Sequence, residues 1–149
     1  MTFIRIWPHE FFRFLLIAAP VDAVWQRLMD DKALHGAIPG CRSLRKRKDG
    51  CLEAQIRVSL AWMKRDVKVA VRRDVKEAGK ALVMIGTRGD AQTGALAVSL
   101  TPEGDGCRLG YTFSANLGGK AAVLGGALLG RTARRMVQET LLRLAQPTV

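Results

Sequence analysis

The chain has 149 residues, of which 48% are hydrophobic, so we expect a single domain, residues 1–149, with a core of its own. Its 24 lysines and arginines outnumber 13 acidic residues and give a formal net charge of +11. This excess predicts an anionic partner, and nucleic acid, an anionic bilayer or an acidic protein would each satisfy it. Aromatic residues make up only 6%, which disfavours a surface that stacks many bases.

The cysteines argue against a metal centre. Cys41, Cys51 and Cys107 lie far apart, form no CxxC pair, and are accompanied by only two histidines. We therefore expect no zinc site and no cofactor. An odd number of dispersed thiols favours reduced cysteines and a cytoplasmic location. No histidine lies near Cys41 in the sequence to activate it, so we interpret this thiol as structural.

The N-terminal region contains a short apolar run, residues 14–19, which loosely imitates a secretory signal. The run ends at Pro20, and the amphipathic segment after it is needed for folding. We therefore predict a first strand over Phe11–Ala18 rather than a signal. No run of about 18 apolar residues occurs in the chain, so we expect no segment that spans a membrane.

Two short helices are predicted next. Val21, Val24 and Leu28 recur at helical spacing, and Pro20 suits a helix entry. A second helix is predicted over Lys32–Gly36, and the turn Ile38-Pro39-Gly40-Cys41 ends it.

From Cys41 to Asn116 the pattern changes to period two, which predicts a meander of antiparallel strands. Apolar residues alternate with polar ones from Leu52 to Leu60 and again from Val67 to Val71. Further strands are predicted at Lys80–Thr87, Ala95–Leu100 and Arg108–Ala115. Turn sequences rich in glycine separate them.

The last predicted element is a long amphipathic helix, Lys120–Ala145. One face carries Ala122, Gly126, Leu129, Ala133, Met136, Thr140 and Leu144, and the opposite face carries Arg131, Arg135 and Gln138. The inner face is small in its first half and bulky in its second. A meander followed by one amphipathic helix must bury that helix against the sheet, so the predicted class is α+β, with an antiparallel sheet curved around the helix.

Two segments resemble a known family, the CoxG-like proteins, which are named for a component of carbon monoxide dehydrogenase. "AAPVDAVWQRLMDDKALHGAIPGC" (18–41) resembles the opening of this family, with its proline-led helix, Val-Trp pair and later Pro-Gly-Cys. "GTRGDAQTGALAVSLTPEGDGCRLGYTFSANLGGKAAVLGGALLG" (86–130) resembles a later block of that family. The resemblance implies the helix-grip fold of the START-like (SRPBCC) superfamily. Residues 1–9 look longer than the usual start of the family.

The family resemblance also implies a function without catalysis. Such proteins accompany molybdenum hydroxylases of the carbon monoxide dehydrogenase type, which they recruit to the membrane, and they bind a lipid or an isoprenoid quinone. We accordingly expect these partners and a location in the cytoplasm, peripheral at the inner face of the membrane. Some relatives carry a C-terminal extension with a membrane anchor, whereas this sequence ends soon after its last helix.

The expected pocket lies between the small face of the last helix and the inward strand residues. Its predicted lining is Leu34, Ile38, Met84, Phe113, Leu124, Leu128 and Met136. Apolar lining suits such a ligand because burial of its tail supplies most of the binding energy, at ~25 cal/mol per Å². The alternative is a packed interior in which the glycines only allow the helix to approach the sheet closely.

Alternation places Arg57, Lys68 and Arg72 on outward positions, and we predict that this basic face contacts an anionic membrane or the partner enzyme. Two other classes compete with the carrier. A nucleic-acid-binding module would use the same face, and a small hydrolase or cyclase would need an ionisable group inside the pocket. Tyr111 is the only tyrosine, and the acidic residues mostly fall at turns, helix ends or outward positions, which disfavours an enzyme.

Overall fold

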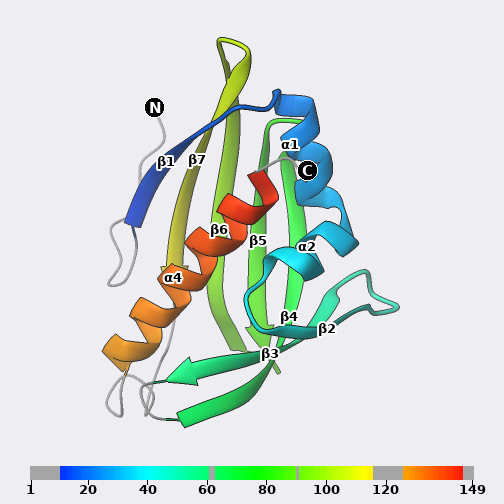
Figure 1. The fold of residues 1–149 in the computed structure, drawn as a ribbon. Coiled ribbons are helices and arrows are strands. Elements are labelled where there is room, and N and C mark those ends of the chain that lie inside the picture. The colour runs from blue at the N-terminus through cyan, green and yellow to red at the C-terminus, as the bar shows by residue number, and fades with distance from the viewer. Residues whose placement is uncertain (1–10, 61–62, 90, 116–125, 146–149) are drawn as a thin grey trace.

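The computed structural model describes residues 11–60, 63–89, 91–115 and 126–145. Within these ranges seven strands form one antiparallel sheet in the order β1-β7-β6-β5-β4-β3-β2. The elements are β1 Phe11–Ile17, α1 Val21–Met29, α2 Asp31–Ala37, β2 Cys41–Lys46, β3 Leu52–Leu60, β4 Met63–Glu77, β5 Ala81–Arg88, β6 Ala91–Glu103, β7 Gly106–Ala115 and α4 Gly126–Ala145. The sheet is curved, and α4 crosses its concave side (Figure 1). The predicted α+β class, with a curved sheet wrapped around the C-terminal helix, is confirmed.

The helices after the first strand are also confirmed. Helix α1 has the expected bounds, and α2 is one residue longer at each end than predicted. It starts earlier because the side chain of Asp30 caps it, accepting a hydrogen bond from the main-chain N–H of Lys32 at 3.1 Å. Periodicity alone does not detect such a cap.

The hairpin between β6 and β7 is longer than predicted. The ladder runs on through Pro102, opposite Cys107, to the pair Glu103 and Gly106. Only two residues are left for the turn, and Gly104 has the positive φ of 58° that a tight turn demands. A proline near the end of a strand had suggested an earlier boundary.

The loop after α2 is fixed to β3. The main-chain N–H of Arg57 donates to the carbonyl oxygen of Gly40 at 2.8 Å. Gly40 has φ +74°, and a Cβ at this position would lie 2.2 Å from the carbonyl oxygen of Arg57. A glycine is therefore required here for both conformation and close approach, as the turn Ile38–Cys41 predicts.

The core forms where the helices meet the upper concave face of the sheet. Helix α4 contributes Leu141 and Leu144, α1 contributes Val24 and Leu28, and all are buried. The outward face of α4 carries Arg131, Arg135 and Gln138, which are exposed as predicted. The predicted start of this helix, with Ala122, lies outside the described residues.

Candidate functional site

Strand registers arrange the inward side chains of the sheet in rows. Side chains alternate between faces, so residues paired across neighbouring strands share one face. One row contains Leu82 of β5, Val98 of β6 and Tyr111 of β7. These residues are only 1%, 2% and 1% exposed, so the helices cover this row fully.

The next row is less completely covered. It contains Arg73 of β4, Met84 of β5, Leu96 of β6 and Phe113 of β7, and we call it the Met84 row. Met84, Leu96 and Phe113 each keep 8% of their surface exposed. The predicted residues Met84 and Phe113 are thus brought together on the concave face, with Leu96 between them.

The third row has few side chains. It contains Val71, Gly86, Gly94 and Ala115. A Cβ at Gly94 would lie 3.4 Å from the ring of Phe113 and 3.1 Å from the carbonyl oxygen of Ser114. The two glycines therefore let the Phe113 ring lie close over the sheet, and the concave face becomes progressively less filled from the Leu82 row towards this end.

The other predicted lining residues have different surroundings. Leu34 of α2 is 2% exposed and belongs to the packed core, and Ile38 packs partly buried against that core. Met136 of α4 is half-buried. Leu124 lies outside the described residues, and for Leu128 the structure describes only the helical backbone. The lining of a pocket by these residues stays a prediction.

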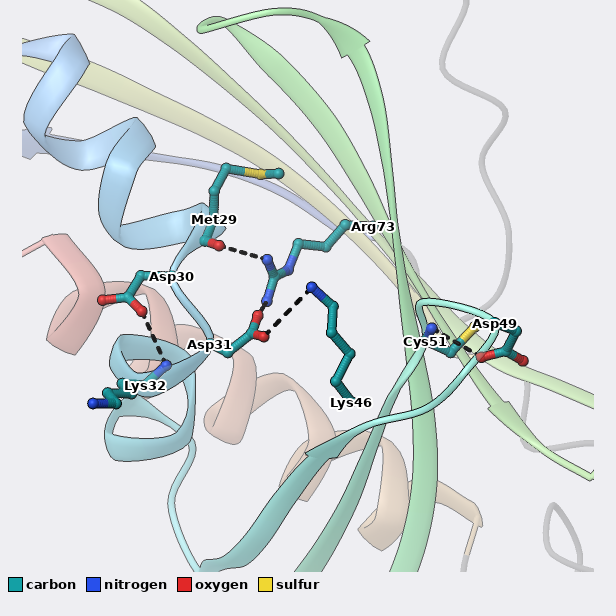
Figure 2. A network of polar contacts seen from close by, with 8 residues as sticks. All are labelled: Met29, Asp30, Asp31, Lys32, Lys46, Asp49, Cys51 and Arg73. Carbon is teal, nitrogen blue, oxygen red and sulfur yellow. Dashed lines mark hydrogen bonds and ion pairs between the residues drawn. The ribbon is translucent and has the colours of Figure 1, made fainter.

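A polar network lies at the edge of the Met84 row (Figure 2). The Arg73 side chain, only 12% exposed, donates from Nη1 to the carbonyl oxygen of Met29 at 2.7 Å and from Nη2 to Oδ1 of Asp31. Lys46 Nζ lies 4.0 Å from Oδ2 of the same carboxylate. Arg73 thus connects β4 to the junction between α1 and α2 and stabilises the C-terminal end of α1.

Sequence reasoning counted Arg73 among the basic surface residues and missed its inward position. The signal was available, because Arg73 keeps the parity of the inward residues Val67, Val69 and Val71 along β4. Leu96 was missed as well, although the same alternation places it between Met84 and Phe113. Both omissions come from reading each strand separately, without the register that joins them.

The described ionisable side chains near the core give little support for acid–base chemistry. Burial raises the pKa of the Tyr111 phenol, and this effect outweighs the opposing influence of Arg13. Burial likewise raises the pKa of the Cys41 thiol, against a smaller opposing effect of its hydrogen bond to the carbonyl oxygen of Ser43. These groups are protonated and weakly nucleophilic at neutral pH. Among the described residues no cluster of three or more histidine, cysteine, aspartate or glutamate side chains could hold a metal ion.

A separate surface hollow of about 420 Å³ lies where the end of β1 meets the β6–β7 turn. Its lining is Leu16, Ile17, Ala18, Glu103, Asp105, Gly106 and Cys107. None of the predicted ligand-binding residues lines this hollow, so it is distinct from the expected pocket.

The three predicted surface residues Arg57, Lys68 and Arg72 are all exposed. Their electrostatic surroundings differ, because Arg57 Nε donates to Oδ1 of Asp66 at 3.0 Å, and Arg42 lies 3.8 Å from the other carboxylate oxygen. The hydrogen bond from Arg57 lowers the pKa of Asp66, so this carboxylate is ionised at neutral pH and offsets the two arginines. The basic face is therefore partly neutralised at its β3 end.

The chain belongs to the CoxG family of carbon monoxide dehydrogenase subunits, which matches residues 15–147. A search of curated proteins gives no match. Among the described residues no helix is both long and apolar enough to cross a membrane.

Solved structures share the fold over nearly the whole chain. A conserved protein from Geobacillus kaustophilus is 25% identical, with a TM-score of 0.77 over 91% of this chain and 92% of its own. A protein from Thermus thermophilus is 19% identical, with a TM-score of 0.67 over 91% and 94%. The Zhui aromatase/cyclase from a Streptomyces species is 14% identical, with a TM-score of 0.64 over 91% and 90%. The fold is thus the helix-grip fold, which includes enzymes as well as proteins of other kinds.

Proposed function

We propose that this chain is a non-enzymatic carrier that binds an apolar molecule, a lipid or an isoprenoid quinone, on the concave side of its sheet. The observation that carries the proposal is the incomplete cover of Met84, Leu96 and Phe113 beside the glycines of the next row. Family membership supports it, because the CoxG name connects the chain with carbon monoxide dehydrogenase. Burial of a tail on this row contributes about 0.8 kcal/mol per CH₂ group.

The proposed role is to link a molybdenum hydroxylase of the carbon monoxide dehydrogenase type to the membrane. The concave face would shield the apolar tail, and the exposed basic face with Lys68 and Arg72 would contact bilayer headgroups or the partner enzyme. Such contacts supply about 1 kcal/mol per basic residue near an anionic surface. The absence of catalysis is part of the proposal, and the protonated Tyr111 and Cys41 side chains support it.

Ligand binding is tested directly with decylubiquinone, a quinone with a short saturated tail. We expect saturable quenching of intrinsic fluorescence, and native mass spectrometry of the purified protein should show a one-to-one complex. Leu96→Trp should abolish binding by filling the concave row. Val83→Trp, on the outward side of the adjacent strand, is the matched control and should bind normally.

A wild-type protein that binds neither decylubiquinone nor extracted lipids would contradict the carrier proposal. Tight, steeply salt-dependent binding of duplex DNA in a filter assay would instead support the competing nucleic-acid module. Co-purification with a molybdenum hydroxylase tests the partner separately.

A further inference from the structure

Arg73 has a hydrogen-bonding capacity that the described residues leave unused. Its two terminal nitrogens bond to Met29 and Asp31, but its Nε–H is buried and has no hydrogen-bond partner within the part of the chain that the structure describes. A buried donor without an acceptor is costly, and native structures contain few of them. This one lies on the inward face of β4, at the end of the row proposed to hold the ligand tail.

We propose that Arg73 is the specificity-determining residue of the pocket, and that its Nε–H donates a hydrogen bond to a neutral acceptor oxygen at one end of the apolar ligand. This inference rests on the proposed function and adds the chemistry of the ligand's polar end. The acceptor belongs to the class of carbonyl or ether oxygens.

The charges around Arg73 favour a neutral acceptor over a carboxylate. Asp31 already occupies the Nη2 edge of the guanidinium and compensates its charge. An anionic ligand at Nε would be repelled by this carboxylate at close range. Lys46 offsets the repulsion only weakly, because its side chain is 67% exposed and lies 4.0 Å from Asp31.

The register directs the rest of the ligand. Met84 is the cross-strand partner of Arg73, followed by Leu96 and Phe113 on the next two strands. These four strands span three interstrand spacings, roughly 14 Å, which gives an apolar track leading away from the guanidinium. A ligand oxygen reaches Nε only if neighbouring side chains shift, and an unbranched methionine at 84 repacks readily.

The test compares three ligands of equal length that differ at one end: 2-tridecanone, tridecanoate, and 2-methyl-1-tridecene, in which a methylidene group replaces the carbonyl oxygen. Each displaces the neutral fluorophore N-phenyl-1-naphthylamine from the protein. For the wild type we expect the ketone to bind about tenfold more tightly than the alkene, as one charge-assisted hydrogen bond allows. Tridecanoate should also bind more weakly than the ketone.

Two variants separate this role from a structural one. Arg73→Lys keeps the positive charge but has no nitrogen at the Nε position, so the ketone and the alkene should bind equally. Asp31→Asn keeps Nε and removes the compensating carboxylate, so tridecanoate should gain affinity relative to the ketone. Arg45→Lys on the outward side of β2 is the matched control and should preserve the wild-type ratios.

The outcomes distinguish the two proposals. If the fluorophore binds but the three ligands compete equally in the wild type, the apolar pocket stands and the role of Arg73 is overturned. If neither the fluorophore nor any of the ligands binds, the carrier proposal itself fails. Should Arg73→Lys not fold, the wild-type ratios and the shift towards tridecanoate in Asp31→Asn still decide the question.

Discussion

Arg27 of α1 binds the C-terminal end of α4. Its Nε donates to the carbonyl oxygen of Leu144 at 2.5 Å, and its Nη2 donates to that of Arg143 at 3.2 Å. Two residues 117 positions apart in the sequence are thereby joined. The last carbonyls of a helix lack partners within it and carry partial negative charge, so a guanidinium satisfies both their hydrogen bonding and their electrostatics.

Replacing Arg27 should therefore loosen the closing helix. We expect Arg27→Met, which keeps most of the side-chain length, to lower the free energy of unfolding by about 1–3 kcal/mol. Urea denaturation followed by circular dichroism measures the change. Gln26→Met, on the exposed side of the same helix, should change stability by less than about 0.5 kcal/mol. Equal effects of the two substitutions would show that the contact contributes little.

The loop glycine and the helix glycine of α2 should respond in opposite directions. Gly40→Ala places a Cβ 2.2 Å from the carbonyl oxygen of Arg57 at a positive φ, so we expect a loss of at least about 2 kcal/mol. A Cβ at Gly36 meets nothing within 4 Å, and Gly36→Ala should stabilise the helix by about 0.5–1 kcal/mol. Thermal denaturation of the two variants tests the pair. A stable Gly40→Ala protein would contradict the close approach of this loop to β3.

Local patterns predicted most of the fold because each strand is half-buried and each helix has one apolar face. The period-two run from Leu52 to Leu60 and the helical spacing from Val21 to Leu28 gave the correct elements. The site is harder to predict because it depends on register. Arg73 and Met84 become neighbours only when the β4–β5 pairing is known, and no local pattern states that pairing. The residues before Gly126, which the sequence places at the small end of the last helix, lie outside the described ranges.

The two adjacent rows of the concave face should tolerate extra volume differently. Val98 is 2% exposed in a fully covered row, so Val98→Phe should overpack the core and cost about 1–3 kcal/mol. Leu96 is on the same strand and the same face but in the incompletely covered Met84 row, so Leu96→Phe should cost less than about 1 kcal/mol. Urea denaturation of both variants measures the difference. Equal costs would indicate that the Met84 row is packed as tightly as its neighbour, which would argue against a pocket there.

The outward basic face should bind anionic vesicles through Lys68 and Arg72. Replacing both by alanine should weaken binding to phosphatidylserine-containing vesicles by ~2 kcal/mol, equal to about thirtyfold, in a co-sedimentation assay at low salt. Asp66 offsets Arg57 and Arg42 at one end of this face, and its lowered pKa keeps it ionised at neutral pH. Asp66→Asn should therefore strengthen vesicle binding.

A second neutralisation controls for net charge alone. Asp105, in the β6–β7 turn beside the surface hollow, is an exposed acid away from β3 and β4. Asp105→Asn changes the net charge by the same amount as Asp66→Asn, but it leaves the basic face unaltered. We expect it to change vesicle binding by less than about twofold, since exposed charges farther apart than about 10 Å are largely screened at 0.1 M salt. Equal gains from both variants would mean that the bilayer responds to the total charge of the protein, and that Lys68 and Arg72 do not define a docking surface.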